Sequence, residues 1–121
     1  MLTKEDIIAV EDIQTETLAV PEWGGEITLR QLTASEADAF ELRITTEKEN
    51  IRARLCAMCI VGDDGKRLFK ASEIDILARK SRRAIDRIFT QCQHINGYTQ
   101  EDVEELEKNS ETGRDESSPS A

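Results

Sequence analysis

Apolar and polar residues alternate along two short stretches near the start of the chain. Residues 15–20 and residues 26–30 each place two aliphatic side chains on one face, which is the spacing of half-buried β-strands. These side chains are Leu18 and Val20 in the first stretch and Ile27 and Leu29 in the second. The intervening residues 21–25 begin with proline and end with two glycines, so they predict a hairpin loop. Because a lone hairpin is marginally stable in water, its apolar face is expected to pack on the helices that follow.

Helical periodicity and capping residues account for most of the remaining chain. The expected helices span residues 3–10, 33–46, 50–61, 72–78, 81–95 and 100–108. Thr3 and Ser72 are suitable N-caps for two of these helices. Thr33 followed by Glu36 has the spacing of a capping box. Residues 62–65, Gly-Asp-Asp-Gly, predict a turn, and Asn96-Gly97 predicts the end of a helix.

The apolar residues of these helices predict the core. The longest continuous stripe lies in residues 81–95, and shorter ones lie in residues 33–46 and 50–61. Their members are Ala84, Ile85, Ile88, Phe89, Cys92 and Ile95; then Ala37, Phe40, Leu42 and Ile44; then Ile51, Leu55, Met58 and Cys59. In the expected last helix, Val103 and Leu106 are the only candidates for burial. The pattern therefore predicts an α+β fold that is mostly α, with an N-terminal β-hairpin packed on a small bundle of four to five helices. We expect one domain over residues 1–108 and a disordered polar tail over residues 109–121, which lack large apolar residues.

Composition narrows the class of protein. The 121-residue chain is 38% hydrophobic and 34% charged, with a net charge of −9. This acidity argues against a general nucleic-acid coat, and no apolar run approaches the length of a membrane span. The start of the chain is polar and three cysteines is an odd number, so free thiols in a reducing cytoplasm are expected. Residues 52–87 nevertheless carry ten basic and five acidic side chains, and this basic middle is typical of a solvated face or of a surface for a complementary partner.

Residues able to carry catalysis or hold a metal are few. Cys56 and Cys59 have the C-x-x-C spacing but lie well inside an apolar helix, where cysteines act as small hydrophobic residues. Cys92 and His94 are two residues apart on a helix and so point in different directions, which disfavours a zinc site built from these four residues. The sequence has no G-x-S-x-G nucleophile motif, no P-loop, no G-x-G-x-x-G dinucleotide motif and no H-E-x-x-H motif. We therefore expect no enzymatic activity, no metal and no cofactor.

Four residues are candidates for binding a protein partner: Trp23, Met58, Phe69 and Arg83. Trp23 lies in the expected hairpin loop, where an aromatic side chain either covers the strand pair or stands exposed as a binding anchor. Arg83 belongs to the basic run at residues 79–83, which is interpreted as a solvated or acid-pairing face rather than a phosphate site, because no aromatic residues are interleaved with it.

The order of several short motifs resembles one known family. The motifs are Val20-Pro-Glu-Trp-Gly-Gly25, a strand that ends near Leu32-Thr33, the helix with Glu36-Ala-Asp-Ala-Phe40-Glu, Asp63-Asp-Gly-Lys-Arg-Leu-Phe69, Lys80-Ser81, Asp86-Arg-Ile-Phe89, Asn96-Gly97 and Glu101 to Asn109. Together they resemble the tail assembly chaperones of long-tailed, non-contractile phages and prophages (siphophages), over residues 2–110. The chain departs from that family at Cys56, Met58 and Cys59, where other small or aliphatic residues are expected.

The resemblance implies a set of properties. In that family the chaperone gene precedes the tape measure gene, and a programmed frameshift produces a longer product, which here would replace the stretch after Lys108-Asn109. The chaperone keeps the tape measure protein soluble, helps to recruit tail tube subunits in the host bacterial cytoplasm and is absent from the mature virion. The family has no catalytic residues.

The expected partners are the tape measure protein, the tail tube protein and further copies of the chain, with neither a membrane nor nucleic acid. An acidic protein that covers the apolar helices of a tape measure protein would limit its aggregation, and docking of a helix in a groove is the expected mode of contact. Two alternatives stay open: a structural tail or head–tail completion subunit retained in the virion, and a small nucleic-acid-binding regulator that uses residues 79–87.

Overall fold

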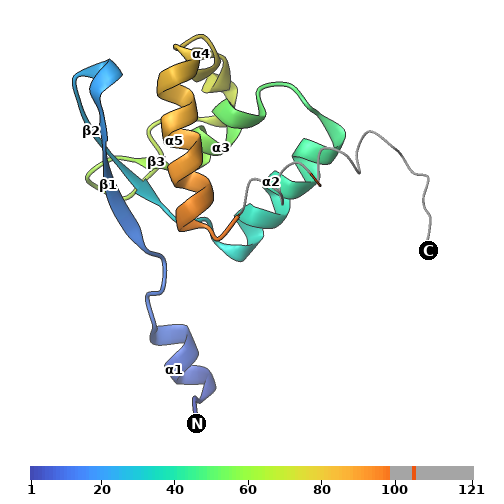
Figure 1. Cartoon of the computed structure of the whole chain (residues 1–121). Helices are drawn as coiled ribbons and strands as arrows, with labels where there is room; N and C mark the ends of the chain where they lie inside the picture. Colours follow the sequence, from blue (N-terminus) through green and yellow to red (C-terminus); the bar gives the residue numbers. More distant parts are fainter. Residues whose placement is uncertain (99–104, 106–121) are drawn as a thin grey trace.

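The structure, a computed structural model, describes residues 1–98 and residue 105. Over these residues the chain forms a small antiparallel sheet covered by helices (Figure 1), which confirms the predicted α+β class. The elements in chain order are α1 (Lys4–Ala9), β1 (Thr15–Val20), the 3₁₀ turn η1 (Pro21–Trp23), β2 (Gly25–Arg30), α2 (Ala34–Thr46), α3 (Ile51–Cys59), β3 (Ile60–Val61), the 3₁₀ turn η2 (Ala71–Glu73), α4 (Ile74–Ala78) and α5 (Arg82–Ile95).

The hairpin of β1 and β2 forms as predicted. The two strands pair in antiparallel register from Thr15 opposite Arg30 to Val20 opposite Gly25. The connection is tighter than a five-residue loop, because Gly25 already belongs to β2 and η1 fills most of the gap. Gly24 adopts a φ of 75° and donates its amide to the carbonyls of residues 20 and 21, a conformation that glycine adopts without steric cost.

The helical prediction for residues 60–61 is wrong. α3 ends at Cys59, and the next two residues form β3, which pairs with the second edge of β2. The sheet order is therefore β1-β2-β3. Both residues of β3 are β-branched and precede the predicted turn at residues 62–65, and the unpaired edge of β2 offers them backbone hydrogen bonds that an extra helical turn would not.

The predicted caps are mostly present. Thr3 and Thr33 each accept a hydrogen bond from the amide three residues later, and each forms a full capping box. Ser72 is not the predicted cap, because it lies inside η2 rather than before it. There the Glu73 carboxylate accepts a hydrogen bond from the Lys70 amide at 2.8 Å and stabilises the start of the turn.

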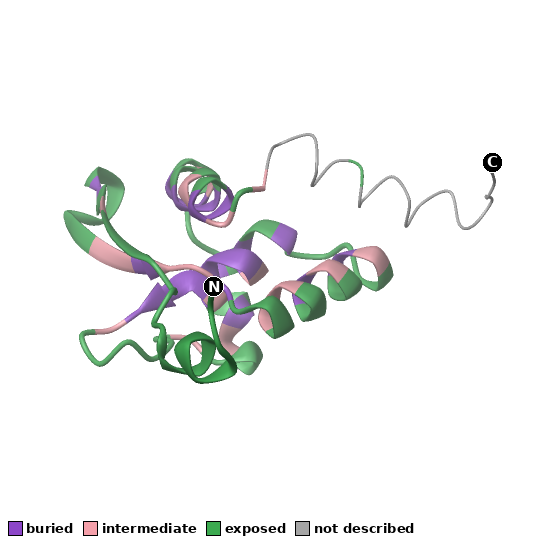
Figure 2. Ribbon diagram, turned by 90° about the horizontal axis from the view of Figure 1, so that it is seen from below, coloured by how far each residue is buried: buried purple, intermediate pink, exposed green. Residues whose placement is uncertain are grey.

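The core lies between the sheet and α3, α4 and α5 (Figure 2). α5 packs along β1 and β2 on one side and α3 on the other, and all six predicted apolar positions of α5 are buried. The same holds for Phe40 and Ile44 in α2. Leu42 was wrongly expected to be buried: it is 66% exposed, because two positions from each of those residues it lies on the opposite face of the helix.

Two predictions near the C-terminal end of the chain are not tested by the structure. Apart from Glu105, which is helical and exposed, the predicted helix at residues 100–108 and the tail at 109–121 lie outside the described residues. Among the described residues, no helix has the length and apolar character needed to cross a bilayer.

Candidate functional site: an arginine-rimmed apolar groove

An apolar hollow lies on the surface between α2, α3 and the segment that leads into α4. Its volume is about 290 Å³, and we call it the groove. Its apolar lining consists of Ala39, Phe40, Ala57, Met58, Phe69, Ala71 and Ile74, and its polar lining consists of Ser35, Glu36, Arg43, Arg54 and Arg67. The groove thus combines an aliphatic and aromatic floor with a rim in which arginines outnumber carboxylates.

The outer wall of the groove, α2, is held at its base by side-chain amides. The Asn96 Oδ1 accepts a hydrogen bond from the Leu32 amide at 2.7 Å, and the Gln31 Nε2 donates to the Ile95 carbonyl at 2.7 Å. These bonds join the chain that follows β2 to the end of α5, two and three residues before α2 begins. They fix the direction in which α2 leaves the sheet and so set the width of the groove.

Glu36 organises one side of the rim. Its carboxylate accepts a hydrogen bond from the Thr33 amide at 2.9 Å and forms ion pairs with Arg30 at 2.7 Å and Arg67 at 2.9 Å. Burial by itself raises the pKa of Glu36, but the Thr33 amide and the two guanidinium groups outweigh it, so the pKa lies below the usual 4.5. Glu36 is consequently charged and fully engaged, and unsuited to acid–base catalysis near neutral pH.

The opposite side of the rim has spare hydrogen-bonding capacity. Arg43 and Arg54 share the Glu47 carboxylate at 3.3 and 3.5 Å, which are long contacts. The Arg54 side chain is only 16% exposed, and its Nε is buried without a hydrogen-bond partner among the described residues. Long contacts of this kind leave the guanidinium groups able to bind another acceptor, and a carboxylate is the best match for a guanidinium.

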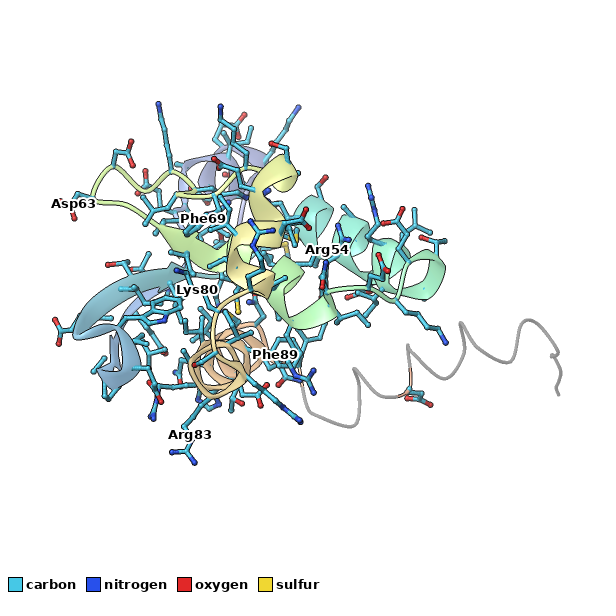
Figure 3. All side chains as sticks on the ribbon, turned by 90° about the horizontal axis from the view of Figure 1, so that it is seen from above. Arg54, Asp63, Phe69, Lys80, Arg83 and Phe89 are labelled. Carbon is cyan, nitrogen blue, oxygen red and sulfur yellow. The ribbon has the colours of Figure 1, made fainter. Side chains whose placement is uncertain are left out.

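The structure brings together two of the four predicted binding residues. Met58 and Phe69 both line the groove, and both are partly buried hydrophobic residues packed against the core. Trp23 and Arg83 lie elsewhere, near the tip of the hairpin, and Arg83 points outward from α5 on the side of the molecule away from Phe69 (Figure 3). Trp23 is 37% exposed, so it is partly covered and partly available at the tip.

The hairpin tip is fastened to α5 by a bidentate ion pair. The Arg87 guanidinium donates to both carboxylate oxygens of Glu22, at 3.0 and 2.9 Å. The hydrogen bond from Arg87 lowers the pKa of Glu22, and the positive charge of Arg83 adds to the effect. Arg87 lies beyond the basic run at residues 79–83; within that run Arg82 pairs with Asp86 at 3.2 Å, in line with the acid-pairing interpretation.

A second hollow, of about 300 Å³, is basic rather than apolar. Lys48, Arg52, Lys80 and Arg82 line it together with the first turn of α3. Arg52 and Arg82 are already engaged, because both form ion pairs with Asp86, at 2.8 and 3.2 Å. The positive charge of this hollow is thus partly neutralised by Asp86.

The three cysteines are core residues, as the sequence predicts. All three are 0% exposed. Hydrogen bonds that the Cys92 thiol makes to the Cys56 and Cys59 sulfurs only in its protonated form, together with burial, raise the pKa of Cys92 well above its ordinary value, which keeps the thiol protonated and unreactive. His94 is exposed and so lies apart from the buried thiols. No group of three or more His, Cys, Asp or Glu residues within the described part of the chain is arranged to hold a metal ion.

One apolar surface was missed by the sequence reasoning. α1 has no buried residue, and the aliphatic side chains in and beside it are largely exposed: Leu2 by 73%, Ile7 by 58%, Ile8 by 72% and Val10 by 58%. Figure 1 shows α1 projecting beyond the end of β1, away from the rest of the molecule. The available signal was the cluster of aliphatic residues among acidic ones at residues 5–13, but a short helix with this pattern is equally typical of one that packs on its own domain.

The fold and the site together describe a small α+β domain with an apolar groove whose rim is rich in arginine. The chain matches no protein-family model, no curated protein and no solved structure.

Proposed function

We propose that the protein is a non-enzymatic phage tail assembly chaperone that binds apolar helical segments of a tape measure protein in the groove. The single observation that carries the proposal is the groove itself, in which the partly buried Met58 and Phe69 lie over the buried Phe40, between positively charged side chains. The family resemblance of the motif order from residue 2 to residue 110 gives the proposal its particular partner.

The chemistry of the groove fits such a client. Burial of one large aliphatic or aromatic side chain contributes about 1.5–3 kcal/mol, and the groove volume of about 290 Å³ lies at the lower end of the range of about 300–1,000 Å³ found for ligand pockets. It therefore accommodates anchor side chains from one face of a helix, not a whole folded partner. The half-buried Met58 adds adaptability, because the flexible thioether packs against side chains of different shapes.

In this proposal the protein acts in the host bacterial cytoplasm. It covers the tape measure protein until tail tube subunits assemble around it, and it leaves before the virion is complete. Many weak, similar contacts along one client suit a groove of this size, since each contact needs to be reversible when the tube subunits arrive.

The test is co-expression with the tape measure protein of the same phage. The wild-type chain is expected to move the tape measure protein from the pellet to the supernatant, and the variants Phe69→Ala and Met58→Ala are expected to lose most of this effect. Leu68→Ala is the matched control, because Leu68 is adjacent in sequence but 56% exposed and does not line the groove. If the wild-type chain leaves tape measure solubility unchanged, the chaperone proposal is wrong.

The two alternatives have separate outcomes. Detection of the chain in purified virions by mass spectrometry would favour a structural tail or head–tail subunit. The basic hollow at the start of α3 is the one observation that favours a nucleic-acid regulator. Retention on heparin at moderate salt, lost in Arg82→Ala with Arg83→Ala, would support that alternative.

A further inference from the structure

The exposed start of the chain, residues 1–13, is an unpartnered apolar segment, which we call the arm. Its four most exposed aliphatic side chains, at residues 2, 7, 8 and 10, lie in and beside the six residues of α1, and Figure 2 shows the residues of α1 as exposed. A helix this short is unstable in water without a surface to pack on. Exposed apolar clusters of this kind generally mark contact sites. We therefore expect the arm to pack against a second surface.

The groove has the complementary chemistry. The arm carries Glu5, Asp6, Glu11 and Asp12 against a single base, Lys4, so apolar and acidic side chains are mixed along it. The groove mixes apolar side chains with Arg43, Arg54 and Arg67. Asp6 is occupied by its capping box with Thr3, which leaves the other three carboxylates of the arm for the arginine rim.

Arg54 supplies an independent reason to expect an acidic occupant. Its buried Nε has no hydrogen-bond partner among the described residues, and its contact with Glu47 is 3.5 Å long. A carboxylate entering the groove would replace this long contact with a shorter charge-assisted hydrogen bond to the terminal nitrogens of the Arg54 guanidinium.

We propose that the arm of one copy of the protein docks in the groove of a second copy. The chain direction disfavours docking of the arm in the groove of its own copy. Gln14 is tied to Gln31 by two hydrogen bonds of 2.9 Å, and Ile13 lines a hollow with Leu32 and Asn96. Asp12 lines the same hollow, so only residues 10 and 11 remain to reverse the chain, and in the structure they lead α1 away from the domain (Figure 1).

This contact is heterologous, because one surface of each copy meets a different surface of the next. Each copy that joins leaves a free groove at one end of the assembly and a free arm at the other, so the pairing extends to open chains or closes into rings. The arm also occupies the surface assigned above to the tape measure protein, and a client would then displace the arm. Docking of the arm in the groove of a second copy does not depend on the proposed function. Its displacement by the tape measure protein does rest on that function.

The first test is the mass of the full-length chain, measured by size-exclusion chromatography with light scattering over a wide range of concentration. The wild-type mass is expected to rise with concentration. The arm variant Ile7→Glu with Ile8→Glu is expected to weaken association by about tenfold or more. This variant does not threaten folding, since α1 contributes no buried residue.

The groove variants are expected to have the same effect. Met58→Glu places a carboxylate on the apolar floor, and Arg43→Glu reverses a charge on the exposed rim, where the side chain is 52% exposed, so that misfolding is avoided. Leu42→Glu is the matched control: it adds the same single negative charge as Met58→Glu, next to Arg43 in sequence but on an exposed face outside the groove, and it should leave the mass unchanged.

Mixing the two classes of variant is the decisive measurement. The arm variant keeps an intact groove and the groove variant keeps an intact arm, so the mixture is expected to form a one-to-one heterodimer that does not grow further. A wild-type chain that stays monomeric at every concentration overturns the proposal, whether its arm is free or docked in its own groove. A mixture that stays monomeric, or arm and groove variants that associate like the wild type, overturns it equally. Co-expression with the tape measure protein tests the proposed function separately. If that function holds, the groove variants lose the ability to keep the tape measure protein soluble and the arm variant retains it, whether or not the copies associate.

Discussion

Replacing Asn96 with alanine tests the junction that sets the direction of α2. The side chain joins the end of α5 to the chain entering α2, since Oδ1 accepts from the Leu32 amide at 2.7 Å and Nδ2 donates to the Cys92 carbonyl at 2.9 Å. In Asn96→Ala the Leu32 amide loses its partner in a residue that is only 8% exposed. An unsatisfied buried donor costs about 1–3 kcal/mol. The Cys92 carbonyl stays satisfied, because it also accepts from the backbone amide of residue 96 at 3.2 Å.

The expected loss for Asn96→Ala is therefore about 2 kcal/mol, which corresponds to a fall in Tm of roughly 10 °C for a domain of this size. Urea unfolding followed by circular dichroism measures the loss, and an unchanged m-value would show that the compactness of the two states is unaffected. His94→Ala, an exposed position on the same helix, should change the free energy of unfolding by less than about 0.5 kcal/mol. If the two variants are equally stable, the hydrogen bond to Leu32 does not hold this junction.

Three further predictions concern the core, the rim and the thiols. Ile44→Ala should lower the free energy of unfolding by about 2–5 kcal/mol, because Ile44 is 0% exposed, whereas Leu42→Ala on the opposite face should change it by less than about 0.5 kcal/mol in the same urea assay. The lowered pKa of Glu36 contributes stability above about pH 4.5 that is lost as the pH falls through the lowered value. Glu36→Gln should thus flatten the fall in Tm between neutral and acidic pH, and parallel curves for the two proteins would argue against the ion pairs. Finally, the buried thiols should react with a thiol reagent only after denaturation, and fast labelling of Cys92 in the native protein would contradict its place in the core.

The two halves of the groove differ in how far sequence could predict them. Met58 and Phe69 were recognisable as candidates, since each is a large apolar residue near the edge of a helical stripe or turn. The rim was not recognisable: Arg43, Arg54 and Arg67 come from three separate segments, and a charge on a helix gives no sign of the segment it will face. The ion pair from Arg67 to Glu36 joins positions 31 residues apart, a separation that local patterns do not report.

The features that the amino-acid sequence determines by itself are local ones. The capping boxes at Thr3 and Thr33, the hairpin and the apolar stripe of α5 follow from hydrogen bonds and spacings within a few residues, so they could be predicted from the residues alone. Tertiary structure decided the features that depend on distant partners. The edge of β2 turned Ile60 and Val61 into a strand, and the amide of Asn96 joined α5 to the start of α2. The groove exists only where these long-range contacts hold α2 beside α3, because a surface hollow is a property of packed elements and not of any one of them.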